Sequence, residues 1–253
     1  MTEHIPNGGG TPSAPLRPRP PRVPGFRPAR RLPYVANVSW PRSGHVLLAR
    51  ILTETFEGWF GYCEYYTPSK VENSPCCGAF PCRRTDIVSM SKQHDFKFDA
   101  ELPDDHLLIV QYRAFLPSLV SHWDQRAATS PGLVDSAEEF RRFARHKAED
   151  YERFLERWVR RPRTNRLLLP YEAFTAEPSR KMRQVLDLFD AADCAGRMEE
   201  VIATIDGLTF ADGGEKKLAG AGIADRRDIT QFRYYDAAFF AELGETTDTD
   251  VTT

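Results

Sequence analysis

The chain has 253 residues, of which 41% are hydrophobic, so it can bury one sizeable core, although its length also allows two small domains. A net charge of -2 argues against a strong global field for nucleic acid and leaves any positive potential to a local site. No apolar run reaches the length of a membrane span, and the N-terminus holds no secretory apolar segment. We therefore expect a cytoplasmic protein without a transmembrane segment or a nucleic-acid partner.

Both ends of the chain have the composition of tails. Residues 1–33 set six arginines among prolines and glycines, and they cannot bury enough apolar surface to offset the entropy lost on ordering. Residues 244–253 are acidic and rich in threonine. We expect disorder over 1–33, a single domain over 34–243 and a flexible tail over 244–253. The arginines would be a solvated extension or, alternatively, an electrostatic tether to an acidic surface.

A strand, a tight loop and a helix are predicted in succession within residues 34–52. β-Branched residues indicate the strand, Pro41 and Gly44 mark the loop, and apolar residues at helical spacing begin at Val46. Free backbone N–H groups and the positive end of the helix dipole would meet at the start of this helix, where a phosphate or sulfate is favoured. The sequence therefore predicts an anion-binding loop with a permanent positive charge at Arg42; an ordinary βα turn is the alternative.

Residues 61–83 have the composition of a cysteine-rich insert. They contain four of the five cysteines, Cys63, Cys76, Cys77 and Cys82. Four thiolates could close a tetrahedral zinc site, although adjacent Cys76 and Cys77 depart from the usual C-x-x-C spacing. Packing cysteines are the alternative, and a reducing compartment disfavours disulfides.

Two further strands are predicted, each followed by polar residues. The first lies within residues 88–96 and ends near His94. The second is the apolar run 107–110, followed by Arg113 and then by a helix that carries Ser121. Because ligands bind at the carboxyl ends of parallel strands, Arg113 and Ser121 can face one crevice there.

The remaining segments predict scaffold. Ser136 and Glu139 form a capping box that opens a long amphipathic helix through about Val159. A strand over 166–171 and a helix over 178–189 follow. The alternation of buried strands and helices is typical of a three-layer αβα sandwich with a mainly parallel central sheet, which is the α/β fold that we predict.

The wording and order of these motifs resemble the sulfotransferases that use 3′-phosphoadenosine 5′-phosphosulfate (PAPS) as donor. The loop PRSG is similar to the PKSG or PRSG loop of that family, and the pair Arg113 and Ser121 has the family's spacing. The order of motifs agrees over residues 35–240, but only these two segments are specific. The resemblance implies a P-loop-like sulfotransferase fold, a bacterial-type member, and transfer of the sulfuryl group to a hydroxyl acceptor, a carbohydrate or a small alcohol.

The resemblance also implies donor-binding residues. The 5′-phosphosulfate would lie against the loop, at Pro41, Arg42, Ser43, Gly44, His45 and Val46. His45 and Val46 stand where the family often has hydroxyl or amide side chains. Arg113 and Ser121 would bind the 3′-phosphate. Arg227 is a further candidate for that phosphate, although the family's Arg-Lys-Gly wording is missing around it.

His94 lies in a segment similar to the family's Lys-x-His, with Lys92 as the lysine. An alcohol is a poor nucleophile near neutral pH, and imidazole can accept its proton in that range. We therefore expect His94 to be the general base, with Asp95 and Glu64 as alternatives. Arg42 is the second catalytic residue expected, because it would stabilise charge on the leaving phosphate, but guanidinium keeps its proton and cannot be a general acid.

The acceptor pocket would form beside His94 from the insert at 61–83, with Glu64, Tyr65 and Tyr66. Aromatic residues near the insert could stack on a sugar ring or could belong to the core: Trp59, Phe60, Tyr62 and Tyr65. Tyr171 and Glu172 lie in a segment similar to the family's Tyr-Glu segment and would organise the sheet edge beside the nucleotide.

Two other functions fit parts of the sequence. A nucleoside or sugar kinase is disfavoured because no G-x-x-x-x-G-K-[ST] motif supplies the lysine and the hydroxyl that holds magnesium. A non-catalytic nucleotide-binding adaptor with a basic tail is the alternative from another class. Sulfuryl transfer requires no metal, so PAPS is the one cosubstrate expected on the donor side.

Overall fold

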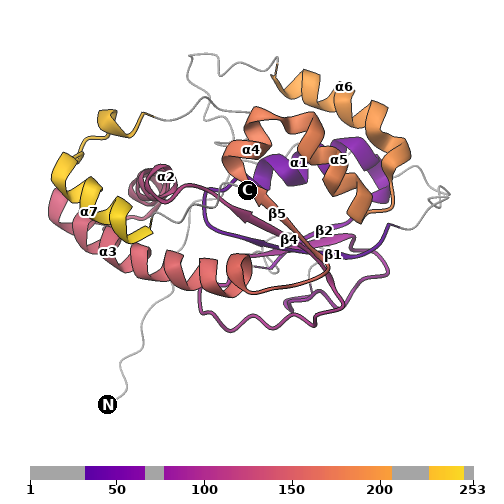
Figure 1. Ribbon diagram of the computed structural model, residues 1–253, viewed down its shortest axis with the longest axis horizontal. Helices are drawn as coiled ribbons and strands as arrows, with labels where there is room; N and C mark the ends of the chain where they lie inside the picture. The colour runs from indigo at the N-terminus through magenta and orange to yellow at the C-terminus, as the bar shows by residue number, and fades with distance from the viewer. Residues whose placement is uncertain (1–31, 66–76, 207–227, 248–253) are drawn as a thin grey trace.

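The structure is a computed structural model that describes residues 32–65, 77–206 and 228–247 (Figure 1). Almost all of the expected tail at 1–33 and most of the tail at 244–253 lie outside the described residues.

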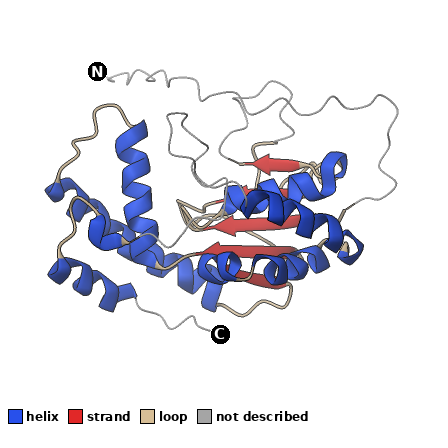
Figure 2. Ribbon diagram, turned by 90° about the horizontal axis from the view of Figure 1, so that it is seen from above, coloured by secondary structure: helices blue, strands red, loops and turns tan. Residues whose placement is uncertain are grey.

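A five-stranded parallel sheet forms the centre of the described chain. Its strands, in spatial order, are β2 (Tyr62–Glu64), β3 (Met90–Gln93), β1 (Val35–Ser39), β4 (Leu107–Tyr112) and β5 (Arg166–Pro170). Every pairing between neighbours is parallel, and the strand arrows point the same way in Figure 2. The carboxyl ends of the strands therefore meet at one edge of the sheet, which is where the predicted site residues lie.

Helices cover both faces of the sheet (Figure 1). One face carries α1 (His45–Phe56), α4 (Tyr171–Ala176), α5 (Pro178–Leu188) and α6 (Ala195–Asp206). The other carries α2 (Phe115–Thr129), α3 (Ala137–Phe154) with its π-helical continuation η2 (Leu155–Arg160), and α7 (Ala237–Thr247). Short 3-10 turns are η1 (Glu57–Trp59), η3 (Ala192–Cys194) and η4 (Ile229–Gln231). The predicted three-layer α/β architecture with a mainly parallel sheet is confirmed.

Strand alternation divides the core into two layers. Val35 and Ile109 face α1, α5 and α6, whereas Ala36 and Val110 face α2 and α3. All five residues of β1 are buried, as expected of a central parallel strand between two helical layers. The two layers hold the strand ends rigidly, which fixes the directions in which the loops leave the sheet.

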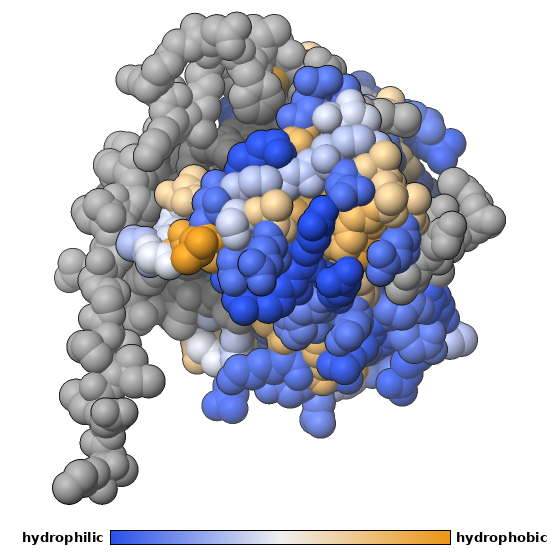
Figure 3. Space-filling model, turned by 90° about the vertical axis from the view of Figure 1, so that its left-hand side faces the viewer, coloured by the Kyte–Doolittle hydropathy of each residue, from blue (hydrophilic) through white to orange (hydrophobic). Residues whose placement is uncertain are grey.

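The capping box of α3 forms as predicted. Ser136 is the N-cap, and its hydroxyl accepts a hydrogen bond from the backbone N–H of Glu139 at 3.3 Å. The helix buries Phe154 against Trp40, which follows β1, and Phe140 against Trp123 of α2 and Phe240 of α7. Figure 3 shows the molecule from the side on which α3 and α7 lie in Figure 1, and much of that face is hydrophilic. The strand predicted over 166–171 is one residue shorter, because Tyr171 already begins α4.

The aromatic residues around η1 and β2 pack mainly into the core. Phe60 and Tyr62 stack with ring centroids 6.4 Å apart, and Phe60 also contacts Phe56 and Phe189 edge-on or tilted. Burial raises the pKa of the Tyr62 hydroxyl well above its usual value. Of the two expectations for Phe60 and Tyr62, the structure supports the core and not the stacking surface for a sugar.

None of the helices in the described ranges combines the length and the apolar character that crossing a membrane requires.

Candidate active site

The loop between β1 and α1 has an open helix start. Gly44 is the N-cap of α1 in the left-handed region, with φ 82°, and no side chain caps this end of the helix. Arg42 also has positive φ, 65°. The first backbone N–H groups of a helix have no partner within the helix, so those of α1 can bind an external acceptor. The loop therefore has the backbone arrangement of an anion site.

Glycine is required at position 44 for two reasons. Its φ of 82° is strained for any residue with a Cβ, and a Cβ built there would lie 2.8 Å from Cδ2 of Tyr171. The loop thus packs directly against the start of α4, and only a residue without a side chain allows this approach.

Two buried polar atoms of the loop have no hydrogen-bond partner among the described residues. They are Oγ of Ser43, a residue that is 0% exposed, and Nδ1 of His45. Burial, together with the charges of Lys92 and Arg42, lowers the pKa of His45 well below its usual value, so the imidazole is neutral at pH 7. Buried polar groups of this kind are normally satisfied, and the oxygens of a bound phosphate or sulfate would satisfy both.

The β1 and β4 junctions meet at the loop. Nε of Arg42 donates to Oγ of Ser121 at 2.9 Å, and Nη1 of Arg113 donates to the backbone oxygen of Arg42 at 3.4 Å. Arg42 comes from the first junction, whereas Arg113 and Ser121 come from the end of β4 and from α2. The structure therefore brings together three of the predicted donor-binding residues that lie up to 79 residues apart in the sequence.

Tyr171 and Glu172 hold Arg113 in place. The guanidinium carbon of Arg113 lies 4.3 Å from the centroid of the Tyr171 ring, and its Nε lies 3.8 Å from Oε1 of Glu172. The same carboxylate oxygen accepts from the backbone N–H of Ala114 at 3.2 Å. The two residues thus support the arginine, as expected of a segment at the edge of the site.

Sequence reasoning missed two supporting residues. The side-chain amide of Gln111 donates to the backbone oxygen of Ser43 at 3.4 Å, and the hydroxyl of Tyr151 donates to the backbone oxygen of Arg113 at 2.8 Å. Gln111 carried a usable signal, since a polar residue at the end of an apolar strand is unusual. Tyr151 carried none, because it lies on the apolar face of α3.

His94 follows β3 immediately and lies beside the end of β1. Its Nδ1 is 2.6 Å from the backbone oxygen of Ser39. A carbonyl oxygen only accepts, so Nδ1 carries the proton and Nε2 carries the lone pair. Nζ of Lys92 is 2.5 Å from Nε2 and also 3.2 Å from Oε1 of Glu64. The ring of His45 meets the ring of His94 edge-on, with centroids 5.1 Å apart.

Burial sets the protonation of this cluster. Burial first, and then the charge of Lys92, lowers the pKa of His94 well below its usual value, so the imidazole is neutral and can accept a proton at pH 7. Burial also lowers the pKa of Lys92, to about 8, although the carboxylate of Glu64 opposes the shift. His94 is therefore a neutral imidazole whose lone pair is on Nε2, and the hydrogen bond from Nδ1 to Ser39 fixes the direction of that nitrogen.

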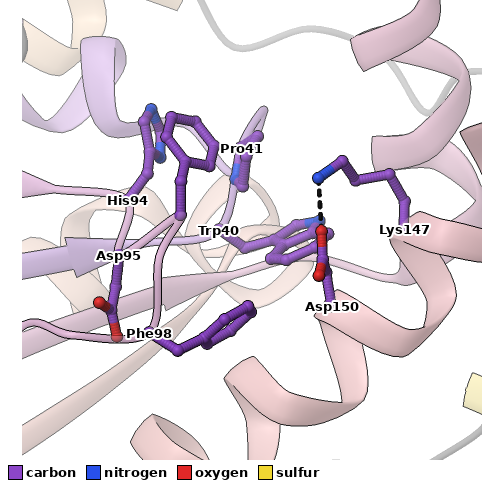
Figure 4. A pocket seen from close by; sticks show the side chains of 8 residues that line it. Trp40, Pro41, His94, Asp95, Phe98, Lys147 and Asp150 are labelled. Atoms are coloured by element: carbon purple, nitrogen blue, oxygen red, sulfur yellow. Dashed lines mark hydrogen bonds and ion pairs between the residues drawn. The ribbon is translucent and has the colours of Figure 1, made fainter.

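Asp95, one of the two alternative bases, points away from this cluster (Figure 4). Its carboxylate accepts from the backbone N–H of Ala100 at 2.8 Å and from Nε1 of Trp158 at 2.9 Å, and it lies 3.1 Å from Nε of Arg157. Asp95 is thereby a structural residue that closes the turn after β3. Glu64, the other alternative, contacts Lys92, which in turn contacts His94.

A pocket opens beside His94 (Figure 4). Trp40, Phe96 and Phe98 provide its aromatic walls, and Phe96 is 48% exposed. On the side of α3 stand Lys147 and Asp150, which pair at 2.5 Å. Its walls come from the β1 loop, the turn after β3 and α3. The described residues of 61–83, the segment from which we expect the acceptor pocket, do not line it, and residues 66–76 lie outside the described residues.

Of the three arginines in the segment 223–236, the structure describes Arg233. Arg227 and its neighbour Arg226 lie outside the described residues. Arg233 donates to Asp124 at 2.5 Å and to Asp135 at 2.8 Å, and these ion pairs raise its pKa. Arg233 therefore joins η4 to α2 and to the loop before α3.

The cysteines form a small cluster behind β3. Cys63 and Cys82 are buried with Val88, and Sγ of Cys77 lies 3.5 Å from Sγ of Cys82. No group of three or more potential metal ligands occurs within the part of the chain that the structure describes. Cys76, the fourth residue of the proposed zinc set, lies outside that part. Cys63 and Cys82 pack as small apolar side chains, whereas Sγ of the half-buried Cys77 accepts a hydrogen bond from the backbone N–H of Arg83 at 3.2 Å.

No protein-family model and no curated protein matches the chain. Among solved structures, the sulfotransferase STF9 from Mycobacterium avium aligns with a TM-score of 0.40 and 18% identity, over 64% of this chain and 42% of that one. The sulfotransferase domain from the curacin biosynthetic pathway aligns with a TM-score of 0.41 and 11% identity, over 87% of this chain and 93% of that one. The chain thus spans less than half of STF9, and with both TM-scores under 0.5 neither likeness is evidence of function.

Proposed function

We propose that this protein is a PAPS-dependent sulfotransferase that moves the sulfuryl group to a hydroxyl acceptor. The observation that carries the proposal is the convergence of Arg42 and Arg113, from two separate strand–helix junctions, at one edge of a parallel sheet. Two guanidinium groups held by neighbouring junctions suit a ligand with two separate phosphate groups, since each can bind one through a bidentate fork.

The residues of the loop fit the 5′-phosphosulfate. Oγ of Ser43 and the neutral imidazole of His45 supply hydrogen bonds, and the uncapped start of α1 supplies backbone N–H groups. Arg113 and Ser121 lie at the neighbouring junction and would bind the 3′-phosphate. Arg227 stays a candidate for the same phosphate.

When bound, PAPS supplies an activated sulfuryl group whose transfer requires no metal. Nε2 of His94 accepts the proton of the acceptor hydroxyl, while Ser39 fixes the direction of the imidazole ring. Arg42 stabilises the negative charge that grows on the leaving phosphate. The acceptor, a carbohydrate or a small alcohol, would place its hydroxyl at His94, where the half-exposed ring of Phe96, which packs on the His94 ring, can contact the rest of the molecule.

Calorimetric titration tests the donor assignment. The desulfated product, 3′-phosphoadenosine 5′-phosphate, should bind without metal and more tightly than ATP with magnesium. Arg113→Ala should weaken this binding about 10- to 100-fold, the usual range for a hydrogen bond to a charged group. Arg142→Ala is the matched control, since Arg142 on α3 is exposed and pairs with Glu139. Preference for ATP with magnesium would refute the proposal in favour of a kinase.

A further inference from the structure

Glu64 and Lys92 form a pair that the proposed proton transfer does not yet use. Lys92 is 1% exposed, and a lysine is rarely so buried unless it is paired. Its Nζ lies between two groups, Nε2 of His94 at 2.5 Å and Oε1 of Glu64 at 3.2 Å. One ammonium therefore contacts both the proposed base and a carboxylate from the neighbouring strand.

Strand register sets this arrangement. β2 and β3 pair in parallel with Glu64 directly beside Lys92, and the backbone N–H of Tyr65 donates to the backbone oxygen of Lys92 at 3.1 Å. Both side chains leave the same face of the sheet, toward His94. The contact thus follows from the backbone ladder of the sheet edge and not from the chance meeting of two long side chains on a surface.

The resting geometry presents a problem for the base. Because Nδ1 of His94 donates to Ser39, the lone pair of Nε2 is the basic site, and the Lys92 ammonium already occupies it. An acceptor hydroxyl can reach Nε2 only if Lys92 turns away. A buried ammonium that turns away needs another acceptor, since an unpaired buried charge is costly. Glu64 supplies that acceptor.

We propose that Glu64 is a positioning residue that keeps Lys92 charged and draws it from Nε2 of His94, so that the acceptor hydroxyl can take its place. The proposal rests on the proposed function, because it takes His94 as the base. The ammonium that Glu64 retains also adds positive charge beside the transferring group, where the transition state gains negative charge. Glu64 then acts through Lys92 and does not itself accept the proton.

Several charged or titratable groups act on this cluster, and they differ in sign. Those around His94 are Lys92 from β3, Glu64 from β2, His45 from α1, Arg42 from the loop, His122 from α2, and Lys147 and Asp150 from α3. Among the groups that act on Lys92, burial lowers its pKa, to about 8, and the Glu64 carboxylate raises it. Removing the negative charge of Glu64 must therefore lower the pKa of Lys92 further.

The test is Glu64→Gln, measured in two ways. The pKa of Lys92 is followed by NMR of labelled lysine without donor or acceptor, and it should fall by one unit or more. For a fall of one unit, kcat/KM should drop about fivefold at pH 8, because half of the wild-type Lys92 is charged at its pKa of about 8. At pH 6.5 kcat/KM should stay near the wild-type value, because Lys92 stays mostly charged there and the amide oxygen of Gln can still accept from it. Glu64→Asp should restore part of both values.

Glu54→Gln is the matched control, since Glu54 lies on α1 and pairs with Arg50; it should change neither value. An unchanged pKa of Lys92 in Glu64→Gln would overturn the proposal. An equal loss of activity at every pH would show that Glu64 does not act through the charge of Lys92 and would also overturn it. Nitrogen NMR of the wild-type protein should show His94 protonated on Nδ1, and protonation on Nε2 would contradict the proposal without any variant. The NMR measurements need no turnover, so they test the role of Glu64 independently of the donor. A failed donor titration would refute the sulfotransferase assignment and would leave the NMR result unaffected.

Discussion

Two polar clusters lie at the end of β3, one around His94 and one around Asp95, and they differ in the partners of their hydrogen bonds. Asp95 accepts from a backbone N–H and an indole, and it pairs with Arg157, all within the scaffold. His94, one residue earlier, directs its basic nitrogen to a lysine that has a second acceptor, and it borders a pocket. A group whose partners are all scaffold supports the fold, whereas a group that can exchange partners is suited to chemistry. The comparison predicts opposite consequences for substitutions at these adjacent positions.

The largest effect is expected at His94. His94→Ala should lower kcat about 10²- to 10⁴-fold, the usual contribution of a general base. Affinity for 3′-phosphoadenosine 5′-phosphate should stay within a few fold, because the proposed donor-binding residues are on the loop and at the β4 junction. Steady-state kinetics and calorimetry on the same preparation separate the two quantities. Undiminished turnover would remove His94 as the base, and an adaptor protein would show no turnover in the wild type.

The next effect is expected at Arg42, in the loop that follows β1 beside the His94 cluster. Arg42→Ala should lower kcat about 10²- to 10³-fold, as does the loss of a group that stabilises transition-state charge. Arg42→Lys should retain part of the activity, since lysine keeps the charge but loses the planar fork. Single-turnover rates at saturating donor would distinguish this loss from weaker binding. Equal rates for the alanine variant and the wild type would refute the role.

A stability effect is expected at Asp95. Asp95→Ala leaves Nε1 of Trp158 and the guanidinium of Arg157 without this buried acceptor, so the free energy of unfolding should fall by about 3 kcal/mol. Urea denaturation measures the change. The folded fraction should keep its kcat within a few fold, and loss of activity in fully folded protein would contradict the structural role.

The fold was accessible from the sequence because its signals are local. Buried strands and amphipathic helices alternate along the chain, and the capping box at Ser136 marks the start of α3 correctly. The meeting of Arg42, Arg113 and Ser121 was also accessible, since parallel strands share one carboxyl edge. These predictions needed only the order of elements and the geometry of a parallel sheet.

Side-chain directions after a strand were not accessible in the same way. The chain turns through Asp95, with φ 53°, and Phe98, with φ 55°, and the backbone N–H of Phe98 donates to the backbone oxygen of Asp95. This turn, which no pattern in the sequence announces, separates Asp95 from His94. The pocket wall from α3 was missed for a related reason. Lys147 and Asp150 look like solvent-facing charges of an amphipathic helix until the tertiary packing is known.

The ring of Tyr171 has a consequence for how the two junctions respond to each other. It fills the space where a side chain at Gly44 would stand, and the guanidinium of Arg113 lies over the same ring. One aromatic side chain thus packs against both the loop that carries Arg42 and the turn that carries Arg113. A displacement of the Tyr171 ring would move both segments together, so the distance between them depends on a residue that belongs to neither.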